Sequence, residues 1–259
     1  MDSPSESNLT MLRALLVATS LLGIAAEDDT CSTVLHYFNI RGRAEAIRMA
    51  LHDLNIPFVD HSFSGDEWGK EKADGLKANW TAAGKLSFGQ VPMLEIDGIE
   101  IVQSHSILRY LGRRSGTANR WYKGTPAALA KIDVAADGVE DVRKKLGAIT
   151  YANAWDRTKR AMLAKYMKDP KECALWLGYF DRLISGSESG FVAGSADASH
   201  ADYLLLDLLD HHVALSKLYK VPAAVFDKVL DALPALTAWA ERMRSRANLK
   251  AYLEGPSRR

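Results

Sequence analysis

The chain has 259 residues, a length that exceeds one average domain and predicts two. Hydrophobic residues make up 47% and charged residues 25%, which is typical of a globular protein that buries a sizeable core without disulfides or metals. The net charge of +1 argues against nucleic acid or an anionic membrane as an obligate partner, and the two cysteines, Cys31 and Cys173, are too few for a disulfide framework or a metal cluster.

The first thirty residues differ in composition from the rest of the chain. Residues 14–26 form an apolar run that is too short to span a bilayer but has the length of the hydrophobic region of a signal peptide. Arg13 precedes this run, whereas Asp2 and Glu6, farther toward the N-terminus, fit a signal peptide poorly. We therefore interpret residues 1–30 as a leader, either a signal peptide or a segment with no targeting role.

A strand, a helix and a second strand are predicted next. Residues 33–38 have a β-type composition, residues 43–54 place apolar side chains on one helical face, and residues 58–63 are β-type again. This spacing is typical of a βαβ unit, which implies a parallel pair of strands. Residues 64–87 are polar and rich in turn residues, and we predict a loop there.

The clearest local signal in the sequence is a hairpin. Residues 93–96 and 99–102 are two short apolar runs separated by Asp97-Gly98, a favoured two-residue turn because both central positions need a positive φ. A helix is predicted over residues 106–113. The first part of the chain is therefore predicted to be an α/β layer of the order β-α-β-loop-β-β-α, with a mixed sheet.

No strand pattern recurs after this helix, and the second part is predicted to be all-helical. Residues 114–124 are polar and are predicted to be a linker. Thr125 followed by Pro126 is typical of a helix start, and Ser199 with Asp202 is typical of a capping box. Beyond a first helix that starts at Pro126, we predict helices over 151–167, 171–185, 199–218, 222–230 and 235–252.

Two polar features of the α/β part point to a ligand. Tyr37 lies near the end of the first strand, where ligands collect in open α/β sheets, and Arg43 is a cation in the first turn of a helix, where a carboxylate would be more stable. Gln103-Ser104 directly precedes a helix, so that Ser104 is the natural N-cap, and the free N–H groups there favour a small anion. The alternatives are a Tyr37 that belongs to the core and a Ser104 that only caps its helix.

Pro92 stands at the start of a strand, which suits a residue that cannot donate to the ladder. If the Val91–Pro92 peptide bond is cis, the backbone of Val91 can face outward and pair with an extended ligand.

Three segments in register carry a family resemblance. The stretches LHYFNIRGRAEAIR (35–48), FGQVPMLEIDG (88–98) and IVQSHSILRYLGR (101–113) resemble the N-terminal domain of a cytosolic-type glutathione S-transferase. The likeness is greatest to the sigma class, which includes glutathione-dependent prostaglandin D synthases, with the pi and mu classes near. It covers about residues 32–255. The resemblance implies a thioredoxin-like domain over 31–113 and an all-helical co-substrate domain over 125–259.

The resemblance also implies a reaction. The hydroxyl of Tyr37 would donate a hydrogen bond to the sulfur of glutathione and stabilise the thiolate, which attacks a small hydrophobic electrophile, and Arg43 would add positive potential beside it. An ordinary thiol with a pKa near about 8.5 is mostly protonated at neutral pH. One hydrogen bond to the charged form contributes about 1.5–3 kcal/mol, which would lower that pKa by about one or two units.

The glutathione contacts implied by the resemblance span both halves of the chain. Val91 would pair its backbone with the cysteinyl unit, and Gln103 with Ser104 would hold the γ-glutamyl carboxylate. Asp141 would reach the γ-glutamyl amino group across a dimer interface. The full set of matching positions is Phe38, Trp68, Lys72, Gln90, Val91, Pro92, Gln103, Ser104 and Asp141.

Two positions depart from the family pattern. Trp68 and Lys72 would reach the glycyl carboxylate, but the stretch that follows Trp68 is longer than in the sigma class, so Lys77 or Lys85 could serve instead of Lys72. His105 stands where the family has a small apolar residue, and we predict no role for it.

The resemblance implies a homodimer that uses glutathione as a co-substrate and holds no metal. It implies a cytoplasmic location, although the leader makes a secretory or organellar route an equal alternative. The alternative functions are a glutathione-dependent isomerase or peroxidase, and a non-catalytic, crystallin-like binding protein on the same fold. The joint presence of Tyr37, Arg43, Gln103 and Ser104 favours an enzyme.

Two further features are assigned structural roles. Cys173 is predicted to be a small buried hydrophobe in a helix. His211 and His212 are adjacent on a helix and point about 100° apart, so we predict a solvated face there and not a metal site.

Overall fold

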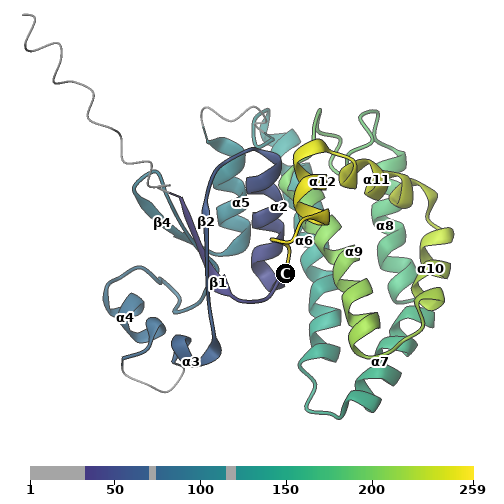
Figure 1. Cartoon of the computed structure of the whole chain (residues 1–259). Helices are drawn as coiled ribbons and strands as arrows, with labels where there is room; N and C mark the ends of the chain where they lie inside the picture. The colour runs from purple at the N-terminus through teal and green to yellow at the C-terminus, as the bar shows by residue number, and fades with distance from the viewer. Residues whose placement is uncertain (1–32, 70–73, 115–120) are drawn as a thin grey trace, which may run out of the picture.

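The computed structural model describes residues 33–69, 74–114 and 121–259 (Figure 1). The predicted leader, Cys31, Lys72 and most of the predicted linker lie outside the described residues. An α/β part and a helical part stand side by side, and α2 and α5 of the first lie next to α6 and α9 of the second. The predicted fold class is confirmed.

The sheet of the α/β part has four strands in the order β2-β1-β3-β4. β1 is parallel to β2, and β3 is antiparallel to both β1 and β4, which confirms the predicted mixed sheet. In the hairpin turn Asp97 and Gly98 have φ angles of 52° and 78°, as the Asp-Gly signal predicts. The strands are β1 (Val34–Phe38), β2 (Val59–Phe63), β3 (Met93–Ile96) and β4 (Ile99–Val102).

One face of the sheet packs against α2 (Glu45–Asp53) and α5 (Ser104–Arg113), and a short 3-10 turn, η1 (Gly42–Ala44), leads into α2. Leu35 and Tyr37 alternate with the outward residues of β1 and are buried on this face. The predicted start of the first helix at Arg43 therefore falls in η1.

The opposite face of the sheet carries a second, smaller aromatic core. The loop predicted over 64–87 is wrong in part, because α3 (Gly65–Trp68) and α4 (Leu76–Ala82) form there. Trp68 stacks on Phe63 with ring centroids 5.4 Å apart, and Trp80 meets the same ring edge-on at 5.7 Å. These contacts with the sheet stabilise helices that are too short to be stable alone.

The helical part follows the predicted pattern with one exception. Arg246 has an extended backbone that ends the helix predicted over 235–252, and its guanidinium bonds Asp53 and Asp197 at 2.6 and 2.7 Å. Tertiary ion pairs therefore divide that helix. The helices are α6 (Pro126–Thr150), α7 (Asp156–Lys168), α8 (Cys173–Ser185), α9 (His200–Leu218), α10 (Ala223–Asp231), α11 (Pro234–Arg244) and α12 (Ala247–Glu254).

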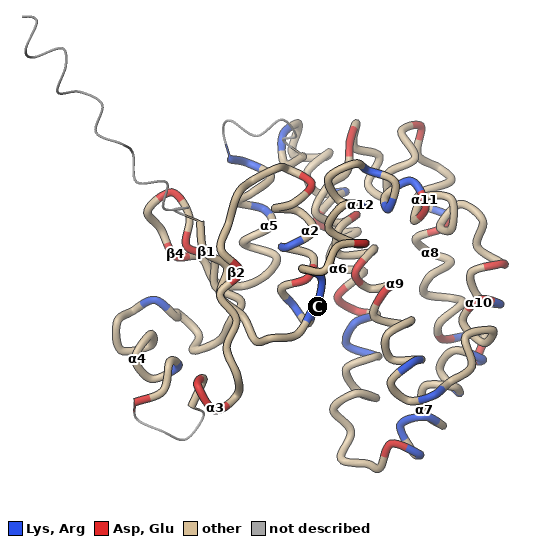
Figure 2. Tube along the Cα trace, in the orientation of Figure 1, with Lys and Arg blue, Asp and Glu red and all other residues tan. Residues whose placement is uncertain are grey.

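The larger hydrophobic core runs through both parts, and polar bonds cross their boundary. The hydroxyl of Tyr203 donates to Asp53 at 2.6 Å, and that of Tyr252 donates to the fully buried Glu45 at 2.9 Å. Charges of both signs lie on the segments that meet between the two parts (Figure 2). The two parts are thus held in one fixed arrangement, which any pocket between them requires.

The burial of Cys173 and of His212 tests the structural roles predicted for these residues. Cys173 is fully buried, as predicted, and burial raises the pKa of its thiol to about 12. The solvated face predicted at His212 is wrong, because this ring is fully buried, stacks on Phe226 with centroids 4.9 Å apart and contacts the hydroxyl of Tyr166 at 3.2 Å. Helical periodicity did not reveal these aromatic neighbours.

No helix in the described part of the chain is long and apolar enough to cross a membrane. Within the same residues, no group of three or more His, Cys, Asp or Glu side chains could hold a metal ion.

The fold makes a prediction at the start of α9. The buried carboxylate of Asp202 accepts hydrogen bonds from the backbone of Ser199 and Val192 and from the indole N–H of Trp239. Asp202→Ala leaves these donors without an acceptor and should lower the free energy of unfolding by about 3 kcal/mol. Denaturant unfolding at fixed protein concentration measures the change. The exposed Asp156, in the first turn of α7, is the matched control, and Asp156→Ala should cost no more than about 1 kcal/mol.

Candidate functional site

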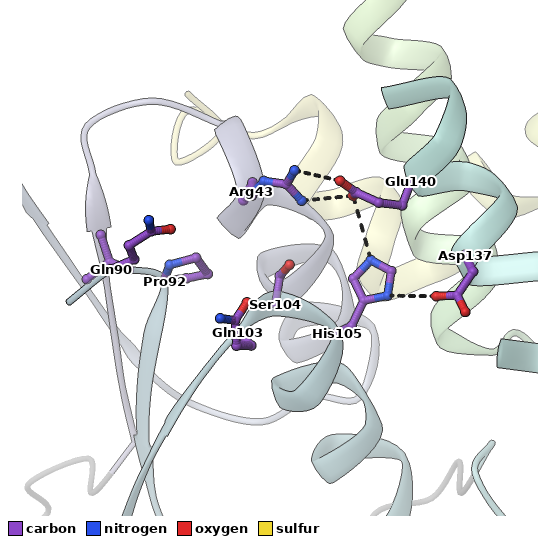
Figure 3. Close-up of a pocket in the computed structure, with 9 residues that line it drawn as sticks. Arg43, Gln90, Pro92, Gln103, Ser104, His105, Asp137 and Glu140 are labelled. Atoms are coloured by element: carbon purple, nitrogen blue, oxygen red, sulfur yellow. Dashed lines mark hydrogen bonds and ion pairs between the residues drawn. The ribbon is translucent and has the colours of Figure 1, made fainter. Parts of the chain in front are cut away.

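A pocket of about 360 Å³ opens between the α/β part and α6 (Figure 3). Its volume lies within the range of small-molecule sites, about 300–1,000 Å³. It brings together six of the predicted site residues and three residues, His105, Asp137 and Glu140, for which no role was predicted. The nine lining residues are Arg43, Gln90, Val91, Pro92, Gln103, Ser104, His105, Asp137 and Glu140.

Tyr37 lies beside this pocket, at the turn from β1 into η1. Its hydroxyl oxygen accepts a hydrogen bond from the backbone N–H of Arg43 at 3.1 Å. Gly42 makes this contact possible, since it has a φ of 45° and a Cβ there would lie 2.7 Å from the Tyr37 ring. In the described part of the chain the Tyr37 hydroxyl donates to no protein group, so its proton can be given to a ligand.

The surroundings of Tyr37 keep its hydroxyl protonated. Burial raises the pKa of Tyr37 above its ordinary value, while the hydrogen bond from the Arg43 backbone and the Arg43 charge oppose that rise. The side chain is only 8% exposed. Tyr37 is therefore built to donate a hydrogen bond at neutral pH and not to act as a base.

The guanidinium of Arg43 crosses to the helical part. It donates two hydrogen bonds to the carboxylate of Glu140 on α6, at 2.8 and 2.7 Å. Burial disfavours the charged form of Glu140, but the hydrogen bonds and charge of Arg43 outweigh it and hold the pKa of Glu140 below its ordinary value. This ion pair explains why Arg43, a cation, stands in the turn that leads into α2.

The loop before β3 forms one wall of the pocket. The Val91–Pro92 peptide bond in this loop is cis. Val91 and Gln90 line the pocket beside it. The ladder between β1 and β3 begins at Met93, so the backbone of Val91 lies outside the paired part of the sheet.

The start of α5 forms the opposite wall. Gln103 is the N-cap, with a φ of 72° that is rare for a residue other than glycine, and Ser104 is the first helical residue. The predicted N-cap is therefore one position too late, because Gln103 adopts the non-helical conformation. Strained backbone of this kind gathers at functional sites, and the free N–H groups and helix dipole at this end favour an anion.

Two predicted contacts lie behind the pocket and not in its lining. Trp68 is 4% exposed and stacked on Phe63, and Phe38 meets Trp68 edge-on with centroids 5.6 Å apart. Both rings therefore belong to the smaller aromatic core.

Of the lysines predicted to contact the glycyl carboxylate, Lys77 and Lys85 lie within the described residues. Lys85 is bonded to Glu95 at 2.7 Å and lies 3.6 Å from Glu100, so its charge is already paired. The side chain of Lys77 lies beside Gly89, next to the pocket residue Gln90.

Asp141 does not enter the pocket of its own chain. Its carboxylate is exposed and accepts a hydrogen bond from Lys144 at 3.1 Å. Asp137 and Glu140, on the neighbouring turns of the same helix, line the pocket instead. Which of these three acids faces α5 depends on the rotation of α6, for which the sequence carries no local signal.

One more residue near Tyr37 was not singled out by the sequence. Tyr151 caps the C-terminal end of α6 and is 88% exposed. Its phenol contributes to raising the pKa of Tyr37 and that of Arg43. Taken together, the site offers a hydroxyl donor, an anion-binding helix start, an open backbone edge and an acidic wall. These groups suit an extended, zwitterionic small molecule whose reacting atom lies at Tyr37.

Comparison with known proteins agrees with this geometry. Residues 33–113 match the family model "Glutathione S-transferase, N-terminal domain", and residues 140–256 match "Glutathione S-transferase, C-terminal domain". The chain is 35% identical to glutathione S-transferase P 1 of Xenopus laevis over 87% of this chain and 93% of that protein. The structure of a pi-class glutathione S-transferase from Onchocerca volvulus is similar, with a TM-score of 0.68, 28% identity and coverage of 86% of this chain and 92% of that one.

A second solved structure shares the fold alone. Rat hPGDS in complex with a quinoline has a TM-score of 0.64 at 22% identity, over 85% of this chain and 95% of that one.

The site makes a prediction about Tyr37 itself. Because burial raises its pKa, Tyr37 should ionise above pH 10. Ultraviolet difference titration of the wild type against Tyr37→Phe isolates this group. Loss of a component that titrates above pH 10 is the expected result. A component that titrates below pH 10 would contradict a hydroxyl that stays protonated to donate.

Proposed function

The chain belongs to the glutathione S-transferase family, and we propose that it binds glutathione in the pocket between β3, α5 and α6 and activates the thiol through Tyr37. It is a glutathione transferase. The observation that best supports the proposed mechanism is the hydrogen bond from the Arg43 backbone to the Tyr37 oxygen, because the oxygen acts there as an acceptor and the hydroxyl can still donate its own proton.

The proposed chemistry requires only a shift in the thiol equilibrium. The glutathione thiol loses its proton to solvent, and the Tyr37 hydroxyl donates a hydrogen bond to the resulting thiolate. The sulfur lone pair then forms a C–S bond with the electrophile, and in a substitution the leaving group departs with its bonding pair. A hydrogen bond to a charged group contributes about 1.5–3 kcal/mol, equivalent to about one or two units of thiol pKa.

Glutathione is proposed to lie along the pocket wall as an extended peptide. Its γ-glutamyl carboxylate takes the helix start at Gln103 and Ser104, where backbone N–H groups and the helix dipole favour an anion. Its cysteinyl unit pairs with the backbone of Val91, which lies outside the sheet ladder. Lys77 is the lysine of the described residues that we favour for the glycyl carboxylate, because Lys85 is paired with Glu95.

The electrophile is proposed to approach from the end of α6. Tyr151 and Trp155 are 88% and 86% exposed there, and Ile40, three residues after Tyr37, is 55% exposed. Exposed aromatic and aliphatic side chains beside a reacting centre suit a small hydrophobic co-substrate.

The active species is proposed to be a homodimer. Phe88, just before the pocket wall, is 70% exposed, and Val134 on α6 is 69% exposed. Val134 lies on an apolar groove of about 360 Å³ that Leu183 and Val192 also line. A symmetric pair would bury Phe88 of each copy in the groove of the other, which satisfies both exposed surfaces at once.

Two further proposals concern the whole chain. We keep the division into a glutathione-binding domain over 31–113 and a co-substrate domain over 125–259. We favour a cytoplasmic location because of the family, and N-terminal sequencing of the native protein tests it, since removal of residues 1–30 would indicate the secretory alternative.

Removing the Tyr37 hydroxyl tests the mechanism. Tyr37→Phe should lower the rate of conjugation of glutathione to 1-chloro-2,4-dinitrobenzene at pH 7 by about 10- to 100-fold, as expected for the loss of a hydrogen bond of about 1.5–3 kcal/mol. The pH–rate profile should move to higher pH by about one or two units. Gly42→Ala should also lower the rate, because a Cβ there displaces the Tyr37 ring.

Three results would count against these proposals. Full activity of Tyr37→Phe would show that another group activates the thiol. Full activity of Gly42→Ala would show that the turn does not position Tyr37. A wild type that binds glutathione but turns over none of a panel of electrophiles and hydroperoxides would favour the non-catalytic alternative.

The dimer prediction rests on Phe88 and Val134. Size-exclusion chromatography with light scattering should give twice the chain mass of 28.5 kDa for the wild type. Phe88→Ser and Val134→Asp should each shift the protein toward the monomer, because they remove or charge an apolar contact. Leu218, 64% exposed at the end of α9, is the matched control, and Leu218→Ser should stay dimeric. Monomeric wild type, or dimeric Val134→Asp, would overturn the proposed interface.

A further inference from the structure

The positive charge of the chain is unevenly distributed. The net charge is only +1, but residues 155–171 contain six Lys and Arg against two Asp. Lys and Arg gather at the end of the helical part that carries α7 (Figure 2). This end of the molecule therefore has a local excess of positive charge that the composition of the whole chain does not reveal.

Four of these cations form a stripe on the outer face of α7. At about 100° per residue they fall within about 140° of one another, while Leu163, Tyr166 and Met167 are buried on the opposite side of the helix. Ala161 and Ala164 lie among the charges, so no large neutral side chain interrupts them. All four cations are exposed, and within the described part of the chain none of them is in an ion pair. We call these residues the cationic stripe: Arg157, Arg160, Lys165 and Lys168.

Exposed apolar side chains flank the cationic stripe. Trp155, directly before α7, is 86% exposed, and Leu218, at the end of α9, is 64% exposed. Lys159 brings the two segments together, because its ammonium bonds the carbonyl of Thr150 at 2.8 Å and lies 6.0 Å from the ring of Tyr219. The end of α9 adds two exposed cations on either side of Leu218, namely Lys217 and Lys220.

This combination of groups fits an anionic lipid bilayer. Cations are attracted to negative headgroups, and Trp and Leu side chains gain free energy when they enter the boundary between headgroups and acyl chains. Nucleic acid would pair with the cations and could stack on Trp155, but it would leave Leu218 in water. We propose that the cationic stripe, with Trp155 and Leu218 as apolar anchors, binds the protein to the surface of an anionic membrane.

The proposed dimer leaves this surface free. Val134, in the proposed dimer interface, lies 16 residues before Thr150 at the end of α6, a distance of about 24 Å along the helix. α7 begins beyond that end of α6. The dimer contact and the cationic stripe are therefore at opposite ends of the helical part.

Docking through this surface would also orient the site. Tyr151 lies at the same end of α6, and its phenol contributes to raising the pKa of Tyr37. A docked molecule would thus turn the entrance proposed for the electrophile toward the membrane, where apolar molecules concentrate. Binding to lipid requires neither glutathione nor Tyr37, so it goes beyond the proposed function.

Cosedimentation of the full chain with vesicles tests the proposal. In about 0.1 M NaCl the wild type should bind vesicles of phosphatidylcholine with about one-third phosphatidylserine, but not vesicles of phosphatidylcholine alone. Raising NaCl to about 0.5 M should release most of the protein, because salt screens the surface charges. Arg157→Glu with Arg160→Glu should weaken binding at least about 100-fold, since each cation contributes about fivefold and a charge reversal counts twice. Acidic residues suit the N-terminal end of α7, so this variant should keep the far-ultraviolet circular dichroism of the wild type.

A matched variant separates the cationic stripe from net charge. Lys123→Glu with Lys250→Glu changes the net charge equally at two exposed positions away from α7, and it should bind like the wild type. Trp155 reports on insertion, because it is the most exposed of the tryptophans and its emission should shift to the blue on binding. That shift should be absent from Trp155→Phe. Every variant keeps residues 1–30, so any binding through that segment would be equal in all of them.

Four results would overturn the proposal. The first is a wild type that does not bind phosphatidylserine vesicles, or that binds phosphatidylcholine equally well. The second is an equal loss of binding in both double variants, which would reduce the effect to net charge. The third is binding without a change in Trp155 emission, since adhesion by charge alone leaves the anchors in water. The fourth is tighter binding to a single-stranded oligonucleotide or to polyglutamate than to the vesicles, which would assign the surface to nucleic acid or to an acidic protein.

Discussion

The bidentate pair between Arg43 and Glu140 is the contact on which the geometry of the site depends. It joins the turn after β1 to α6, and so sets the distance between the two walls of the pocket. The side chain of Arg43 is 47% exposed, so the pair contributes little to overall stability, since exposed pairs give about 0–1 kcal/mol. Its importance is positional, because two parallel hydrogen bonds fix the direction of the guanidinium as well as its distance. The backbone N–H of Arg43 also donates to the Tyr37 oxygen, and the carboxylate of Glu140 lies 4.0 Å from Nε2 of His105.

This arrangement lets Arg43 donate hydrogen bonds to two acceptors, one through its backbone and one through its side chain. The backbone N–H of Arg43 favours negative charge at the Tyr37 oxygen, while its side chain removes much of the negative field of Glu140. The helix start at Gln103 adds a positive dipole end only one residue from His105. Positive potential therefore covers the positions proposed for the carboxylate and the sulfur, and negative potential remains at Asp137. Such a field would orient the proposed zwitterionic ligand as it approaches the pocket.

Features of the structure that depend on neighbouring residues could be predicted from the sequence. The Asp97-Gly98 turn, the start of α6 at Thr125 and the capping box of α9 were all predicted from residues at most three positions apart, and all are present. The predictions that were wrong concern features that depend on contacts between distant segments. α4 exists because Trp80 packs on the sheet, and His212 is buried because Phe226 and Tyr166 cover it. The pairing of Arg43 with Glu140 joins residues 97 positions apart, which no local pattern could reveal.

The two walls of the pocket differ in a similar way, because one depends on backbone geometry and the other on side chains. The wall proposed to bind the peptide depends on backbone geometry that few residues adopt, namely the positive φ angles of Gly42 and Gln103. Substitution there disturbs the main chain, so this wall has little freedom to vary, and a sequence motif could identify it. The wall formed by α6 consists of side chains on a regular helix, where most residues other than glycine and proline can be exchanged at a cost of less than about 1 kcal/mol in helix propensity. Asp137 and Glu140 are of this second kind. Side chains on α6 can therefore change the charge balance of the pocket while the backbone of the opposite wall, the proposed glutathione site, stays the same. His105 lies between the two walls, because it belongs to α5 and its ring nitrogens lie 4.0 Å from Asp137 and Glu140 of α6.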